Sequence, residues 1–251
     1  MPSDPTTCAD GPGAPPLLPE GAPAALAGLA AACAQCHHCG LAETRQQVVV
    51  GRGNPAARLL LIGEAPGAEE DASGLPFVGR AGKLLEQLLA EAGLDSERDL
   101  FIANVIKCRP PGNRKPSRAE IAACRPWLQQ QIALQRPQLI ALLGATALEA
   151  LLGVKGGITR LRGQWLELVE DRPQLLHPAQ TTQPQQQTPP TNRQPGQFPS
   201  LNLQNIELMP LLHPSYLLRN PSGQEGSPKW HTLQDFRLLR RRLDELAAGQ
   251  G

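Results

Sequence analysis

Residues 58–64 read RLLLIGE, a short run of leucine and isoleucine that ends in a glycine and a carboxylate. An uninterrupted apolar run of this length is typical of a strand that is buried on both faces, as in a parallel sheet. Three further segments have a similar character, and we predict them to be strands: DLFIANVIKC (99–108), QLIALLG (138–144) and ELMPLLHP (207–214).

Helical patterns lie between and beside these runs. They predict helices at residues 23–35, 81–93, 118–134, 145–153 and 230–249. Ser117 and Glu120 form a plausible capping box at the start of the third helix. Strands that alternate with helices predict an α/β fold, in which three layers (α/β/α) enclose a central, mainly parallel four-stranded sheet.

Polar residues gather where the predicted strands end. Glu64 follows the first strand, Asn104 lies late in the second, Gly144 ends the third and His213 ends the fourth. Ligands of parallel α/β sheets bind beyond the carboxyl ends of the strands. We therefore expect these residues to converge on one site.

The 251 residues are enough for one α/β domain with a substantial core. Residues 1–22 are rich in proline, glycine and alanine and are predicted to be disordered, and residues 23–251 form the folded domain. Within it, residues 171–206 are dominated by glutamine, proline and threonine. Such a composition cannot bury a core, so this segment is predicted to be a flexible surface insertion.

The net charge of +1 gives no global field that would attract nucleic acid or a membrane surface. Any contact with DNA must therefore come from local clusters of basic residues. The apolar runs are far shorter than a membrane span, and the N-terminus lacks the pattern of a signal peptide. We expect a cytoplasmic protein that acts as a monomer away from membranes.

Six cysteines in such a chain indicate metal binding or catalysis more than disulfides. Cys36 and Cys39 form a C-x2-C pair, and Cys108 and Cys124 add two distant thiols. Four thiolates suit zinc or an iron–sulfur cluster, although the spacing differs from that of a zinc ribbon.

Other assignments of these ligands are open on spacing alone. Cys33 forms a competing C-x2-C pair with Cys36, and His37 and His38 are further candidate ligands. The alternative to a metal site is a set of ordinary buried cysteines. Cys8 lies in the predicted disordered segment and is expected to take no part.

Three long segments agree with one family. The chain resembles a family 4 uracil-DNA glycosylase in GEAPGAEEDASGLPFVGRAGKLL (63–85), NVIKCRPPGNRKPSRAEIAACRPWL (104–128) and HPSYLLRNPSGQEGSPKW (213–230). The resemblance implies a uracil-DNA glycosylase fold that carries a 4Fe–4S cluster. CGLAETRQQVV (39–49) also resembles the segment after the family's first cysteine pair. This register implies the ligands Cys36, Cys39, Cys108 and Cys124 rather than Cys33.

The resemblance also implies the chemistry of the site. Such an enzyme flips uracil out of DNA and stabilises the negative charge that develops on the departing base. His213, in the family's HPS motif, would donate a hydrogen bond to a uracil oxygen. LLHPA (175–179) nearly copies LLHPS (211–215), so His177 is a rival, but only His213 precedes the matching text SYLLRN.

Uracil recognition falls to residues of the first two motifs. The Asn104 amide has a donor and an acceptor for uracil O4 and N3–H, which disfavours cytosine. Phe77 would stack on the base, and the backbone of Ala65, Pro66 and Gly67 would approach it closely. The alternatives are a strand-end cap for Asn104 and a plain core position for Phe77.

Two carboxylates are candidates for catalysis near the sugar. Glu64 and Asp71 belong to the same GEAPG-x3-D segment, and either one would orient water or stabilise a cationic sugar. The resemblance favours Glu64 as a lining residue of the catalytic pocket. For Asp71 the alternative is that it only holds the loop.

Basic residues gather just before Cys108 and between Cys108 and Cys124. Lys107, Arg109 and Arg114, with Lys115 and Arg118, are expected to grip DNA phosphates on a loop that the cluster holds in place. The alternative is a solvated run of charges. A second DNA-contacting segment is implied after the HPS histidine, with Ser215, Tyr216 and Arg219.

The predicted function is removal of uracil from DNA, leaving an abasic site for base excision repair. No candidate lysine nucleophile lies in the pocket motifs, so the expected enzyme is monofunctional, without lyase activity. The alternatives are a covalent uracil-binding relative, a non-catalytic metal-bearing DNA-binding module and a glycosylase of broader specificity. The covalent branch has a basic insertion, whereas the insertion here is rich in glutamine and proline.

Overall fold

The computed structural model of the protein describes residues 22–169, 172–175, 203 and 205–248. Nearly all of the predicted disordered N-terminus, residues 1–21, lies outside the described residues. So does most of the predicted insertion, residues 176–202, and with it His177. None of the described helices is both long and apolar enough to cross a membrane.

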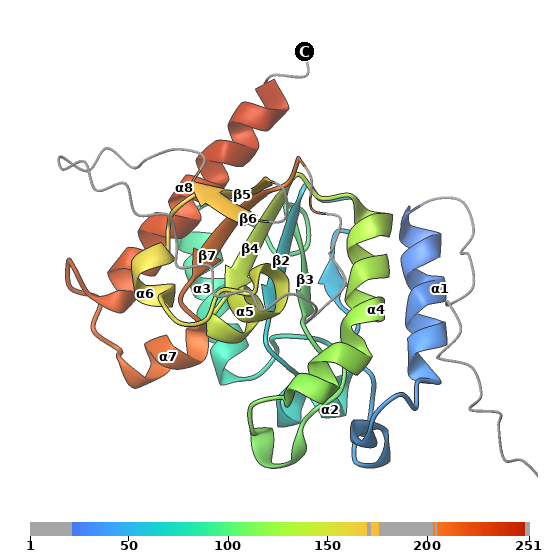
Figure 1. Cartoon of the computed structure of the whole chain (residues 1–251). Helices are drawn as coiled ribbons and strands as arrows, with labels where there is room; N and C mark the ends of the chain where they lie inside the picture. The colour runs from blue at the N-terminus through green and yellow to red at the C-terminus, as the bar shows by residue number, and fades with distance from the viewer. Residues whose placement is uncertain (1–21, 170–171, 176–202, 204, 249–251) are drawn as a thin grey trace, which may run out of the picture.

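Four parallel strands form the centre of the sheet (Figure 1). They run in the order β3, β2, β4 and β7, with bounds Leu100–Asn104, Leu59–Gly63, Leu139–Leu143 and Glu207–Leu211. Each lies within a segment predicted from its apolar run. The α/β class and the parallel centre of the sheet are thus confirmed.

The sheet has three more strands in the described residues, so the predicted number of four is wrong. Antiparallel β1 (Arg52–Gly53) lies beside β3, and the antiparallel pair β5 (Leu166–Val169) and β6 (Arg172–Leu175) extends the sheet beyond β7. These three outer strands, of which β1 and β6 form the edges of the described sheet, are short and include glycine, proline and charged residues, so they lack the apolar run of a central strand. β6 also shows that the start of the predicted insertion, residues 172–175, pairs in the sheet.

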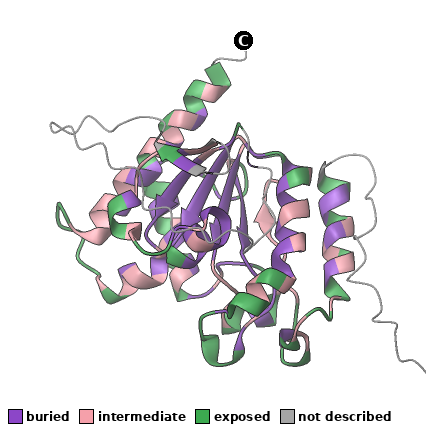
Figure 2. Ribbon diagram, in the orientation of Figure 1, coloured by how far each residue is buried: buried purple, intermediate pink, exposed green. Residues whose placement is uncertain are grey.

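The two faces of the sheet carry separate sets of helices (Figure 2). Because side chains alternate along a strand, Leu60 and Ile62 face one core while Leu59 and Leu61 face the other. The first core contains residues of α1 (Ala22–Ala34), α4 (Arg118–Gln135) and α5 (Ala145–Leu152). The second contains residues of α3 (Arg80–Glu91), α7 (Pro214–Arg219) and α8 (Pro228–Ala248).

Short helices shape the connections near the carboxyl ends of the strands. They are η1 (Gly40–Glu43), α2 (Ala68–Ser73), η2 (Pro111–Asn113) and α6 (Ile158–Leu161). The capping box predicted for α4 is confirmed. Glu120 N–H donates to Ser117 Oγ at 3.2 Å, and Ser117 N–H donates to Glu120 Oε2 at 2.7 Å.

Candidate active site and cysteine pocket

A cavity of about 350 Å³ opens at the carboxyl ends of β2, β4 and β7. Its wall includes Glu64, which follows β2, and Gly144, which follows β4. His213 follows β7 and is the N-cap of α7. The expected convergence of strand-end residues is therefore present for these three positions, and Ser215, Tyr216 and Arg219 of α7 also line the cavity.

The side chain of Glu64 is held by a residue that the sequence analysis did not single out. Thr146 lies in the first turn of α5, is 4% exposed and donates a hydrogen bond from Oγ1 to Glu64 Oε2. Glu64 itself lines the cavity, so this bond holds its carboxylate at the cavity wall. A charge-assisted bond of this kind fixes the direction of a catalytic carboxylate.

His213 is neutral and carries its proton on the nitrogen that faces away from α7. Ser215 N–H donates to His213 Nδ1 at 3.1 Å, and Ser215 Oγ lies 2.8 Å from the same nitrogen. A backbone N–H can only donate, so Nδ1 accepts and the proton of the neutral ring lies on Nε2. Burial, with a smaller contribution from the Arg219 charge, lowers the pKa of His213 to about 4.

Phe77, Asn104 and Gly63 meet beside His213. The Phe77 ring lies 5.9 Å from the His213 ring, measured between centroids. A methyl group on Gly63 would lie 2.5 Å from both Phe77 Cζ and Asn104 Oδ1, so glycine is required there. Phe77 has φ of +55°, a left-handed conformation that is costly for an aromatic residue.

Asn104 presents an unused acceptor. The residue is 2% exposed, and Oδ1 has no hydrogen-bond partner in the described residues. A buried amide oxygen without a partner is costly in a folded protein and indicates a missing ligand group or water. The donor that completes this site must come from outside the described side chains.

The loop from Ala65 to Gly67 runs between Glu64 and α2 and is tied to the Phe77 segment by Glu70. Glu70 Oε2 accepts from Gly67 N–H at 3.0 Å, and Glu70 Oε1 accepts from the N–H groups of Val78 and Gly79. Ala65, Pro66 and Gly67 do not line the 350 Å³ cavity, and neither do Phe77 and Asn104. Phe77 contacts the cavity wall at His213, and Asn104 lies next to Phe77 at Gly63.

Asp71 is not among the residues that line the 350 Å³ cavity, and its catalytic role stays a prediction. The residue is 1% exposed, and Oδ1 accepts from the N–H groups of Gln46 at 2.9 Å and Gln47 at 3.4 Å. Asp71 thus holds the segment after η1 against α2. This is the loop-holding alternative stated above.

The predicted basic rim is only partly free to contact DNA. Lys107 is fully buried, so its prediction as a phosphate contact is wrong for this conformation. Arg114 makes two hydrogen bonds with Glu120 and holds the pKa of that carboxyl at about 2. Its charge is already balanced, which weakens the case for phosphate binding.

The other basic residues are more accessible. Lys115 and Arg118 share Glu149, at 3.7 and 3.9 Å, and their side chains are 58% and 64% exposed. Arg109 bonds the neutral side chain of Asn113 through Nε at 2.7 Å. Arg219 is exposed at the edge of the cavity. Arg109 and Arg219 form no ion pair with any carboxylate of the described residues, which leaves their charge available for a phosphate.

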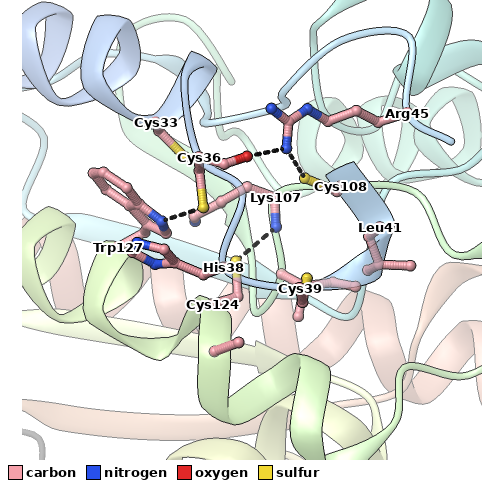
Figure 3. A pocket seen from close by; sticks show the side chains of 12 residues that line it. Cys33, Cys36, His38, Cys39, Leu41, Arg45, Lys107, Cys108, Cys124 and Trp127 are labelled. Carbon is pink, nitrogen blue, oxygen red and sulfur yellow. Dashed lines mark hydrogen bonds between the residues drawn. The ribbon is translucent and has the colours of Figure 1, made fainter. Parts of the chain in front are cut away.

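A second pocket gathers five cysteines on the α4 side of the sheet (Figure 3). Cys36 and Cys39 come from the segment between α1 and η1, Cys108 follows β3 and Cys124 belongs to α4. Cys33, at the end of α1, is 1% exposed and lines the same pocket. The four predicted ligands are therefore brought together, and the rival Cys33 lies with them.

Three N–H groups point at the sulfurs. Trp127 Nε1 donates to Cys36 Sγ at 3.3 Å, Lys107 N to Cys124 Sγ at 3.2 Å and Arg45 Nη1 to Cys108 Sγ at 3.5 Å (Figure 3). Burial raises the pKa of the Cys124 thiol to about 12 and also raises the pKa values of the Cys33 and Cys108 thiols. A metal that takes these sulfurs as thiolates must therefore displace protons.

The thiols do not converge on one point. In the part of the chain that the structure describes, no three histidine, cysteine, aspartate or glutamate side chains are grouped to hold a single metal ion. His38 stacks on Trp127 with ring centroids 6.2 Å apart, at the pocket wall. The arrangement places sulfurs around a space and not about a single centre.

Three contributors escaped the sequence analysis: Thr146, Glu70 and Arg45. Thr146 and Arg45 act on partners far away in the chain, whereas Glu70 bonds residues three to nine positions away. Glu70 gave the only available signal, because it lies three residues after the loop glycine Gly67, the spacing of a capping box. The roles of Thr146 and Arg45 become visible only in the folded structure, because their partners are distant in the sequence.

Comparison with known proteins adds independent findings. Residues 50–237 match the model of the uracil DNA glycosylase superfamily. A type-4 uracil-DNA glycosylase of Thermotoga maritima is 40% identical over 191 residues, which cover 76% of this chain and 81% of the relative.

More distant or shorter matches agree. A type-4 uracil-DNA glycosylase of Sulfurisphaera tokodaii is 46% identical over 134 residues, which cover 51% of this chain and 60% of the relative. A type-5 uracil-DNA glycosylase of Thermus thermophilus is 39% identical over 118 residues, covering 41% and 53%.

Proposed function

The chain belongs to the uracil-DNA glycosylase superfamily and, within it, to the type-4 enzymes, and we propose that it hydrolyses the N-glycosidic bond of uracil in DNA. The product is an abasic site for base excision repair. The observation that carries this proposal is the buried, unpartnered Oδ1 of Asn104 beside Phe77 and His213. Uracil supplies the missing donor through N3–H.

The Asn104 amide contacts the two neighbouring groups, N3–H and O4, that distinguish uracil from cytosine. Oδ1 accepts from uracil N3–H, and the amide nitrogen donates to O4. Cytosine reverses this pattern, with an unprotonated N3 and an exocyclic amine, and would leave Oδ1 unpaired. A site with such a buried polar group rejects the wrong base strongly. Phe77 is proposed to stack on the flipped base.

His213 and Glu64 act on opposite sides of the N-glycosidic bond that breaks. As the bond to the sugar lengthens, negative charge develops on the base, and neutral His213 stabilises it by donating from Nε2. Glu64, aimed by Thr146, faces the sugar side, where it orients the attacking water or stabilises positive charge. No step requires His213 to be charged, which agrees with its lowered pKa.

The proposed cofactor is a 4Fe–4S cluster held by Cys36, Cys39, Cys108 and Cys124. The donor set is purely thiolate, and N–H groups point at three of the four sulfurs, which is how proteins tune such clusters. A cluster binds each thiolate to a different iron, so the sulfurs need not converge on one ion. The cluster would supply structural support for the loop between Cys108 and Cys124.

Lys115 does not change the proposal of a monofunctional enzyme, although the structure brings it to the cavity wall. The expectation that no candidate lysine nucleophile lies in the pocket motifs stays a prediction. A nucleophilic lysine is activated by desolvation or by a neighbouring cation. Lys115 is 58% exposed and lies beside the Glu149 carboxylate, which is the opposite environment.

The test is excision from an end-labelled oligonucleotide with one uracil, followed by hot alkali. The proposal expects cleavage after alkali and none before it. A strand cut without alkali would contradict the monofunctional assignment. DNA binding without any excision would favour a binding module, and an SDS-resistant complex would favour the covalent relative.

A further inference from the structure

Lys107 is a fully buried lysine that lies between the two sites. Its Nζ donates to the backbone carbonyl of Asn104 at 2.9 Å and to Gln131 Oε1 at 2.6 Å. The same residue lines the cysteine pocket, and its backbone N–H donates to Cys124 Sγ. One residue thus contacts both the strand end that carries Asn104 and a predicted cluster ligand.

The surroundings of this ammonium group contain no balancing carboxylate. Both acceptors of Nζ are neutral, and Lys107 forms no ion pair with any carboxylate of the described residues. An isolated buried charge is expensive unless a counter-charge lies nearby. The groups on its other side are the thiols of the cysteine pocket, where the Lys107 backbone N–H donates to Cys124 Sγ at 3.2 Å.

Cluster binding would provide that counter-charge. A 4Fe–4S core held by four thiolates carries roughly two net negative charges in its common oxidised state. Two residues that line the pocket carry a positive charge, the buried Lys107 and the half-buried Arg45. Arg45 donates to Cys108 Sγ and to the Cys36 carbonyl, the latter at 2.7 Å. The charges of the site then balance without a carboxylate.

We propose that Lys107 is a positioning residue that couples the cluster site to base recognition. Its ammonium group offsets the negative charge of the cysteine-bound cluster, and its bond to the Asn104 carbonyl fixes the residue whose amide reads uracil. The inference rests on the proposed function and on the proposed cofactor. It assigns Lys107 no contact with DNA and the cluster no redox step.

The first experiment compares the cluster-loaded wild type with Lys107→Met, which removes the charge at similar volume. The control Lys83→Met makes the same change at an exposed position on α3. A cation beside the cluster favours reduction, so Lys107→Met should shift the midpoint potential to more negative values, and Lys83→Met should leave it unchanged. The potential is read from cluster absorbance in a redox titration.

Kinetics test the link to Asn104 in the same samples. Lys107→Met should lower kcat about tenfold while KM for uracil-containing DNA changes less than about threefold. The reason is that Asn104 is held less firmly in the variant, and Asn104 contacts the reacting base and not the rest of the DNA. A merely structural lysine would lower the iron content or the folded fraction without shifting the potential of the loaded protein. A wild-type potential and a wild-type kcat in Lys107→Met would overturn the inference.

A second variant decides the charge argument if Lys107→Met does not fold. Gln131→Glu keeps the shape of the side chain that Nζ contacts and adds a negative charge there. It should also move the potential to more negative values, and an unchanged or more positive potential would refute the role of Lys107. If wild-type protein excises no uracil, the proposed function fails, while the potentials still decide whether Lys107 balances the cluster.

Discussion

Thr146→Val tests whether Thr146 aims the Glu64 carboxylate. Valine has nearly the shape of threonine, so the change removes the hydroxyl donor without opening a cavity. Thr146 is 4% exposed, so water has little access to replace the lost donor. A hydrogen bond to a charged group contributes about 1.5–3 kcal/mol, which corresponds to a loss of roughly 10- to 150-fold in the rate of excision.

The assay is single-turnover uracil excision at saturating enzyme, with DNA affinity measured separately. Thr146→Ser restores the hydroxyl and should recover most of the rate. In a Glu64→Gln background the valine change should cost much less, because its charged partner is gone. The reasoning is refuted if Thr146→Val excises at the wild-type rate, or if its cost is the same with and without the Glu64 carboxylate.

Three further outcomes follow from buried groups. With a pKa of about 4, His213 stays neutral from pH 8 down to pH 5, so the rate of excision should fall with protonation of His213 only as the pH drops through about 4. The NMR titration of the His213 ring should show the same midpoint, and a midpoint near 6.5 would contradict this. Cys108→Ala should lose iron, fold stability and DNA affinity together, whereas Cys33→Ala should keep about four irons per chain. Loss of iron in Cys33→Ala would show that Cys33 is a cluster ligand, against the proposed assignment. Arg162 and Asp235 form a largely buried ion pair, so Asp235→Ala leaves the Arg162 charge without its partner. The free energy of unfolding, measured by denaturant titration, should fall by about 3–5 kcal/mol. A change below about 1 kcal/mol would show that the pair is well solvated.

The central strands were predictable because each is an apolar run buried on both faces. The edge strands were not, because their pairing depends on a neighbour and not on their own pattern. β6, for example, includes Pro173 and Gln174, and among the described strands its partner is β5. A segment too polar to form part of a hydrophobic core can still pair as an edge strand.

The sequence placed the site at the strand ends because topology alone brings Glu64, Gly144 and His213 together. It could not predict contacts that depend on the direction of the side chain. Lys107 and Asp71 both lie in motifs rich in charge, yet both turn inward and bond backbone or amide groups. Spacing along the chain does not record which way a long side chain points.

The measurement that tests the central claim most directly is the release of free uracil and free cytosine from matched oligonucleotides by wild-type protein and by Asn104→Asp. Wild type should release uracil and no cytosine. The aspartate has no donor for uracil O4, and its oxygens repel that atom, so uracil release should fall about 100-fold or more. Uracil release by Asn104→Asp at the wild-type rate would contradict the claim that the buried, unpartnered amide of Asn104 is the group that reads the base.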